Sequence, residues 1–156
     1  MGTKRVGWAR IKSLIDENEN ALQIRKKVTK SAAASGTTTL TADDSGKVIL
    51  LAPNAAVLVL PAPQVGLHFE VVHTGAFAST KSEIRTDAGT TFFIGGHAAY
   101  NGGNCATPGA TDDRLEFDTG ATAGDSVQLI CVSSTEWAVR GITATSTSIT
   151  YTDGGS

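Results

Sequence analysis

The sequence predicts a mainly β protein: a single antiparallel β-sandwich or barrel-like domain of jelly-roll type, preceded by an N-terminal helical arm. From Thr37 onward, short alternating or apolar runs are separated by turn residues, and no helical period follows the arm. The first 30 residues, in contrast, are charged and carry apolar residues at helical spacing. A chain of 156 residues, 40% of them hydrophobic, has room for one such domain plus an appendage.

The arm, residues 1–30, is predicted to be helical from about residue 8 to residue 27. Its apolar stripe follows a spacing of three, four, three and four residues, with a polar Asn at the fourth position: Trp8, Ile11, Ile15, Asn18 and Leu22. Such a helix is about 30 Å long and too poor in apolar positions to be stable alone. Its stripe therefore faces a sister helix, a larger partner or its own domain.

Charge divides the chain at Lys30. Residues 1–30 hold eight basic and three acidic side chains, a balance of +5, whereas the other 126 residues hold five basic and twelve acidic ones, a balance of −7. The arm and the body therefore attract opposite partners. Nucleic acid, an anionic membrane, an acidic protein surface, the chain's own body and plain solvent are all open to the basic arm.

Residues 31–38 are small and without period, which predicts a linker before a β-domain at 39–143. In TTTLTADDSGKVILLA, two runs flank a turn at Asp43–Gly46, and AAVLVLPAP is a strand ended by Pro61 and Pro63. GLHFEVVHTG alternates like a half-buried strand. KSEIRTDAGTTFFIGG adds two more strands.

RLEFDTGATAGDSVQLICVSSTEWAVRGITA contributes three strands, the last two forming a hairpin closed at Ser133–Thr135. Residues 144–156 are rich in Thr and Ser and predict an edge strand or a disordered tail. The Gly-rich segment 95–109 predicts a long irregular loop with Tyr100 exposed, of the kind that often carries binding.

Candidate catalytic and metal-binding residues do not form a recognisable pattern. His68 and His73 are five apart on a strand and point to opposite faces, and His97 lies in the Gly-rich segment. The acid pairs Asp43/Asp44 and Asp112/Asp113 are explained by turns. We therefore expect no catalytic residue, no metal and no cofactor. Cys131 is expected to be buried; Cys105 is open to two states, a free thiol or a bridge to Cys131, and cytoplasmic synthesis favours the free thiol.

Targeting signals are not evident either. The arm lacks an apolar signal-peptide core, and the longest apolar stretch is interrupted by Pro53, Asn54 and Pro61, which excludes a membrane span. We expect a chain made in the cytoplasm of the cell that produces it.

Three stretches carry a family resemblance: KRVGWARIKSLIDENEN, TTLTADDSGKVILL followed by LPAPQVGLHFEVVHTG, and STEWAVRGI. Together they resemble small virion proteins of tailed bacteriophages, especially the capsid decoration (cement) proteins of marine and cyanobacterial phages. The resemblance covers most of the chain.

The resemblance implies a non-enzymatic β-rich body, usually a homotrimer, on the outer surface of the phage head. Its partner is the major capsid protein, not nucleic acid or a membrane, and the N-terminal arm docks across neighbouring subunits. Carried over to this chain, the contacts comprise apolar anchors and charged residues: Trp8, Ile11, Ile15, Leu22, Arg5, Arg10 and Lys12. Many arms of this class are extended, which differs from the helical pattern here.

Two other readings stay open. In a head-fibre or tail-fibre component, the arm would associate as a coiled coil through the stripe that contains Asn18, and the loop at 95–109 would bind host glycan. In a small carbohydrate-active enzyme, acids between Asp112 and Asp125 would act on the glycosidic bond, although no motif places a pair of them.

Overall fold

The computed structural model describes residues 10–13, 29–86 and 89–154 of the chain. In this part the protein is mainly β, as predicted, with one short 3-10 helix, η1 (Ala42–Asp44). Its strands are β1 (Thr29–Ser31), β2 (Gly36–Thr39), β3 (Val48–Leu51), β4 (Ala56–Val59), β5 (His68–His73), β6 (Ser82–Arg85), β7 (Phe92–Ala99), β8 (Arg114–Phe117), β9 (Ser126–Cys131), β10 (Glu136–Thr143) and β11 (Ile149–Thr152).

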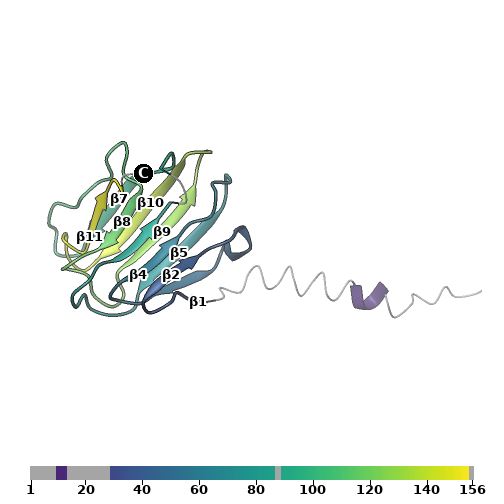
Figure 1. Cartoon of the computed structure of the whole chain (residues 1–156), viewed down its shortest axis with the longest axis horizontal. Coiled ribbons are helices and arrows are strands. Elements are labelled where there is room, and N and C mark those ends of the chain that lie inside the picture. The colour runs from purple at the N-terminus through teal and green to yellow at the C-terminus, as the bar shows by residue number, and fades with distance from the viewer. Residues whose placement is uncertain (1–9, 14–28, 87–88, 155–156) are drawn as a thin grey trace, which may run out of the picture.

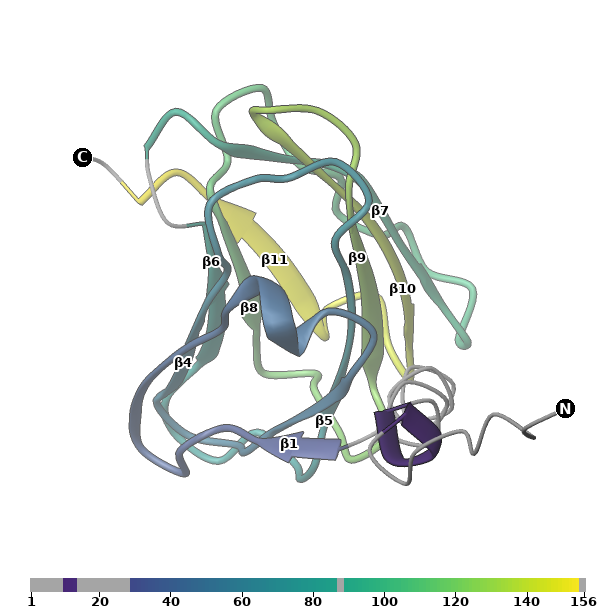
Figure 2. The same ribbon diagram turned by 90° about the vertical axis from the view of Figure 1, so that its right-hand side faces the viewer.

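Within the described residues, these strands form two sheets (Figure 1). The six-stranded sheet has the order β1-β3-β5-β9-β10-β7, and the five-stranded sheet has the order β11-β8-β6-β4-β2. The two sheets face one another, with β4 and β6 on one side and β9 and β10 on the other (Figure 2). One hydrophobic cluster, drawn from both sheets, lies between them.

The core follows from alternation along each strand. Every second residue of β9 and β10 is buried, and Trp137 on β10 is fully buried with its ring centroid 5.8 Å from that of Phe69. From the other sheet, Leu58, Ile84 and Phe117 enter the same cluster, each 0% exposed. Because strand side chains alternate between faces, the residues between these core positions point outward from the two sheets.

The prediction of an antiparallel domain was wrong. Among the described strands, five of the nine pairings are parallel: β1 with β3, β3 with β5, β2 with β4, β4 with β6, and β7 with β10. The prediction assumed that short links make hairpins. Up to β9, however, each link carries the chain across to the opposite sheet, so that alternate strands return to the same sheet. From β1 to β6 they return in the same direction, and parallel pairing follows.

The predicted linker, residues 31–38, was also placed wrongly, because four of its eight residues lie in strands. Ser31 ends β1, and Gly36 begins β2. The amide of Ala32 donates to the Leu50 carbonyl at 2.8 Å, and the side chain of Ala32 is buried. Small residues carry no hydrophobic period, so the backbone hydrogen bonds to β3 and β4 reveal β1 and the start of β2, whereas the run predicted from Thr37 overlaps the rest of β2.

Other local predictions fared better. β9 and β10 form the expected hairpin, η1 and Ser45–Gly46 supply the expected turn, and the Thr/Ser-rich end contains β11. The loop prediction was partly wrong, because β7 continues through both of its glycines to Ala99. The irregular segment therefore begins near Tyr100, which is 95% exposed as expected.

Gly95 bends β7 against its neighbour. Its φ is +102°, a conformation that L side chains rarely adopt, and a Cβ there would overlap the backbone oxygen of Val139 on β10. Gly102, in the following loop, also has a positive φ of +72°, but a Cβ there would meet no atom within 4 Å.

We expect Gly95→Ala to lower the free energy of unfolding by about 2–4 kcal/mol, because backbone strain and a forced shift of β10 add together. Gly102→Ala is the matched control and should cost only about 1 kcal/mol from strain. Urea unfolding of both variants measures the difference. Equal losses would contradict the proposed contact between β7 and β10.

Candidate interaction surface

Some of the predicted contact residues lie within the described part of the chain, and the others lie outside it. Arg10, Ile11 and Lys12 belong to a helical segment, residues 10–13, and all of them are exposed (Figure 1). The remaining predicted contacts lie outside the described residues: Arg5, Trp8, Ile15 and Leu22. The described segment agrees with the helical prediction, and the rest of the predicted helix stays a prediction.

The arm joins the domain at a buried carboxylate. Asp44, at the end of η1, accepts from the Lys30 ammonium at 2.5 Å and from the Lys47 ammonium at 2.6 Å. The backbone amide of Thr41 donates to the same carboxylate at 3.1 Å and completes a capping box. The last residue of the basic arm is thereby tied to the first turn of the body.

The environment of Asp44 keeps it ionised. Burial acts to raise the pKa of its carboxyl, but the hydrogen bonds from Lys30 and Lys47 outweigh burial and hold the pKa far below its usual range. Because the pKa of Asp44 is lower in the folded state, its ionised carboxylate stabilises the fold at pH values above about 4, the ordinary pKa of Asp. This stabilisation is lost as the pH falls from there through the lower pKa of the folded state.

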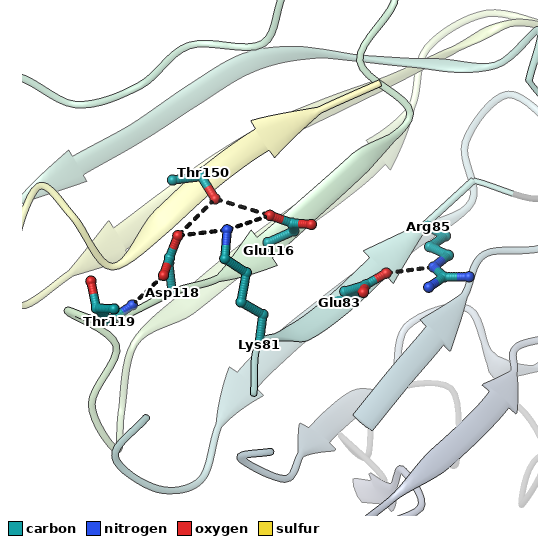
Figure 3. A network of polar contacts seen from close by, with 7 residues as sticks. All are labelled: Lys81, Glu83, Arg85, Glu116, Asp118, Thr119 and Thr150. Atoms are coloured by element: carbon teal, nitrogen blue, oxygen red, sulfur yellow. Dashed lines mark hydrogen bonds and ion pairs between the residues drawn. The ribbon is translucent and has the colours of Figure 1, made fainter. Parts of the chain in front are cut away.

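The outer face of the five-stranded sheet carries a network of charges (Figure 3). The Lys81 ammonium lies 2.8 Å from a Glu116 oxygen and 2.7 Å from an Asp118 oxygen. The Thr150 hydroxyl on β11 donates to both carboxylates, at 3.3 and 3.4 Å. Lys81 thus binds two carboxylates, and these carboxylates in turn bind Thr150 on β11.

This network compensates an unfavourable register. Glu83 lies directly opposite Glu116, and Arg85 lies directly opposite Arg114, so like charges face each other between β6 and β8. Within β6, Arg85 donates to Glu83 at 2.5 Å, and Lys81 neutralises Glu116. Hydrogen bonds to Asp118 and Glu116 raise the pKa of Lys81. Burial acts to raise the pKa of Asp118, but Lys81 overcomes it and lowers that pKa.

The outer face of the six-stranded sheet has a different character. Four of its outward side chains are exposed aliphatic residues: Ile94, Ile130, Val132 and Ile142. Ile130, Ala138 and Ile94 lie side by side in one row across β9, β10 and β7. Exposed apolar side chains that gather on one face mark an interaction site more often than scattered ones do. We name this outward surface the aliphatic face.

A shallow depression of about 220 Å³ opens at one side of the aliphatic face. Its walls are formed by the turn before β3 and by outward residues of β5 and β9: Gly46, Lys47, His68, Glu70, Gln128 and Ile130. The sequence signal for this face was weak but present. VQLICV is apolar on both faces of its strand, which a one-sided sheet does not require.

Inside the domain, two histidines lie in dry surroundings. His73 is 1% exposed and stacks on Phe117, with ring centroids 4.7 Å apart and an interplanar angle of 8°. His97 lies 6.3 Å from the ring of Tyr151. Burial lowers the pKa of both histidines, against the opposing charge of Asp125, and raises that of Tyr151. As predicted, His68 is exposed on the opposite face of β5 from His73.

Carboxylates between residues 112 and 125 are engaged within the fold. Asp112 accepts from the amide of Gly109, Asp113 from that of Gly154, and buried Asp125 from that of Ala144. Glu116 and Asp118 share Lys81. These contacts shape loops and strands, and they give the carbohydrate-active reading no further support.

The described residues contain no group of three or more side chains placed to hold a metal ion. Cys131 is buried, as predicted, and both Cys131 and Cys105 are free thiols. In the described part of the chain, no helix has the length and apolar character needed to cross a bilayer. No protein-family model matches this chain, and no curated protein matches it either.

We expect Lys81→Met to lower the free energy of unfolding by about 1 kcal/mol at pH 7. Lys81 is 38% exposed, so solvent screens its ion pairs, but its loss leaves Glu116 and Asp118 without their shared cation and leaves Glu116 opposite Glu83. Arg85→Met is the control and should be nearly neutral, because it also removes the facing pair with Arg114. Urea unfolding measures both. A larger loss for Arg85→Met would contradict this account.

Acidification should destabilise the domain through its buried histidines. Their folded-state pKa values are lowered, so the stabilisation is complete above about pH 6.5, the unfolded value, and declines as the pH falls below it. For His73 the loss between pH 7.5 and 5.5 is at most about 1.4 kcal/mol. His73→Phe keeps the stacking on Phe117 and should flatten this decline in urea unfolding. An unchanged pH dependence would refute the assignment to His73.

Proposed function

We propose that this chain is a non-enzymatic capsid decoration (cement) protein that binds the outer surface of a mature tailed-phage head. Its partner is the major capsid protein, whose subunit contacts it stabilises, and its location is the virion. The family resemblance of the sequence supports this proposal. The two facing sheets suit a sandwich-like body of the kind that such proteins present on the head.

The observation that carries the proposal is the division of the chain into a basic arm and an acidic body. Arg10, Ile11 and Lys12 are exposed on a helical segment, so charged and apolar contacts are both offered to a partner. Lys30 fixes the end of this arm to the body through Asp44. A clamp of this kind stabilises a joint because opening the joint must also release the clamp.

A head-fibre or tail-fibre component remains the second candidate. Tyr100 favours it, because an aromatic side chain that is 95% exposed beside a loop suits contact with a sugar ring. In that case the arm would associate with sister arms instead of docking on capsid subunits.

The test is co-sedimentation of the purified full chain with phage heads that lack it. We expect Trp8→Ala combined with Ile11→Ala to weaken binding at least tenfold, because apolar anchors dominate interface energetics. Arg10→Glu should weaken binding in a salt-dependent way. Arg85→Glu, which carries the same charge change on the body, should bind as the unaltered chain does.

Absence of binding by the unaltered chain would overturn the decoration proposal. Binding of the unaltered chain to immobilised host glycan, lost on Tyr100→Ala, would then favour the fibre reading.

A further inference from the structure

The aliphatic face carries one cation that the body leaves without a counter-charge. Arg140, on β10, is exposed and makes no ion pair within the described part of the chain. Lys47, at the far side of the face, is already bound to Asp44, and Glu70 already interacts within the chain. Three exposed isoleucines lie around Arg140 on β7, β9 and β10: Ile94, Ile130 and Ile142. A partner that fits this surface is therefore apolar and carries a carboxylate.

The arm contains one such segment, residues 14–28, which lie outside the described part of the chain and which we name the inner half of the arm. All three acids of the arm fall in it: Asp16, Glu17 and Glu19. On the predicted helix, Glu19 is four residues after Ile15 and three before Leu22, so it lies beside the apolar stripe. Residues 1–13, the outer half, carry four basic side chains and no acid. The inner half therefore has the chemistry that Arg140 and its neighbours require.

We infer that the inner half of the arm docks on the aliphatic face of its own chain, with Glu19 paired to Arg140. The end of this segment is fixed at the same sheet. It joins β1 at Thr29, on the edge of the six-stranded sheet, where Lys30 is bound to Asp44. A segment tethered at that edge reaches the adjoining face at an effective concentration of about a millimolar, so it outcompetes a free partner of the same chemistry.

The length of the segment matches the width of the face. β10 is four strands from β1, or about 19 Å away at a strand spacing of about 4.8 Å. On a helix that rises about 1.5 Å per residue, Glu19 lies ten residues, or about 15 Å, before Thr29. The long side chain of Arg140 spans the remaining distance, so the ion pair forms without unwinding the predicted helix.

Apolar residues of the stripe meet apolar parts of the face in the same register. Leu22 lies seven residues, or about 10 Å, before Thr29, which places it over β5 at the depression of about 220 Å³. Ile15 lies fourteen residues, or about 21 Å, before Thr29, which places it between β10 and β7, near Ala138 and Ile94. Each of these contacts covers aliphatic surface that the body alone leaves in water.

The outer face of the five-stranded sheet is the weaker candidate for this segment. β1, where the arm ends, belongs to the other sheet. The lysine and carboxylates of the five-stranded sheet already satisfy one another, as Lys81 does with Glu116 and Asp118. None of the large hydrophobic residues that are exposed in the described part of the chain lies on its strands. Docking there would remove water from charges without adding apolar burial.

The same register leaves the outer half of the arm beyond the sheet. β7, the last strand of this sheet, is about 24 Å from β1, whereas Trp8 lies about 32 Å before Thr29 along a helix. The exposure of Arg10 and Lys12 agrees with this placement. The inner half thus attaches the arm to its own body, and the basic outer half stays available to another surface. Docking of the inner half needs no capsid, so it goes beyond the proposed function.

The test is disulfide trapping in the full chain, with Cys105→Ser as background. We expect Leu22→Cys with Ile130→Cys to oxidise to a link within one chain, which denaturing mass analysis distinguishes from a link between chains. Ile24→Cys with Ile130→Cys is the matched control. Ile24 lies nine residues from Ile15, on the opposite face of the predicted helix, so its link should form at least ten times more slowly.

The ion pair is tested in the same trapping background. Arg140→Glu should slow the link from Leu22→Cys about fivefold, because it replaces an exposed ion pair by two like charges. Glu19→Arg combined with Arg140→Glu should restore the rate. Arg85→Glu, with the same charge change on the five-stranded sheet, should leave the rate unchanged.

Four results would overturn the inference: no link from Leu22→Cys, a link only between chains, equal rates from Leu22→Cys and Ile24→Cys, or a rate that Arg140→Glu leaves unchanged. A link only between chains would mean that the arm of a second copy covers the face. Far-ultraviolet circular dichroism shows whether each variant is folded, and rescue by Glu19→Arg excludes a folding defect of Arg140→Glu. The experiment uses no phage heads, so its failure and a failure to bind capsid are distinguishable.

Discussion

Repeated crossing of the chain between two sheets is the constraint on which the structure depends. From β1 to β9 each described link leads to the opposite sheet, so neither sheet can form without the other. The inner faces must therefore supply one common core, and the fully buried Trp137 and Phe117 enter it from opposite sheets. The outer faces are under no such constraint, and each is free to acquire its own chemistry.

The two outer faces carry different kinds of side chains. On the five-stranded sheet, like charges meet across strands and are neutralised by neighbours such as Lys81, which suits a surface that stays in water. On the six-stranded sheet, Ile94, Ile130 and Ile142 are left outward and exposed. An exposed aliphatic side chain gains only when a partner covers it, so the second face is the one that favours association.

Sequence periodicity was sufficient to predict which face of a strand a residue occupies and where a hairpin forms. It was insufficient to predict which strands pair with one another. The alternation in GLHFEVVHTG puts His68 and His73 on opposite faces of one strand, and VQLICV with STEWAV gives the hairpin of β9 and β10. The pairing partners were not accessible, because parallel or antiparallel pairing depends on whether a link crosses between sheets. Lys81 and Glu116 are 35 residues apart and meet only through that crossing. Ser31 and Gly36 belong to a stretch of small residues without a hydrophobic period, so they were taken for linker, whereas the run predicted from Thr37 overlaps β2.

The arm and the aliphatic face offer contacts with different physics. The arm carries a balance of +5, so its attraction to an acidic surface weakens as salt screens it. The aliphatic face offers apolar burial through Ile94, Ile130 and Ile142, which depends on salt much less. Asp44 binds Lys30 of β1, so it connects the end of the arm to the sheet that carries the aliphatic face. The two contacts would therefore respond differently to salt, because charge dominates at the arm and apolar burial dominates at the aliphatic face.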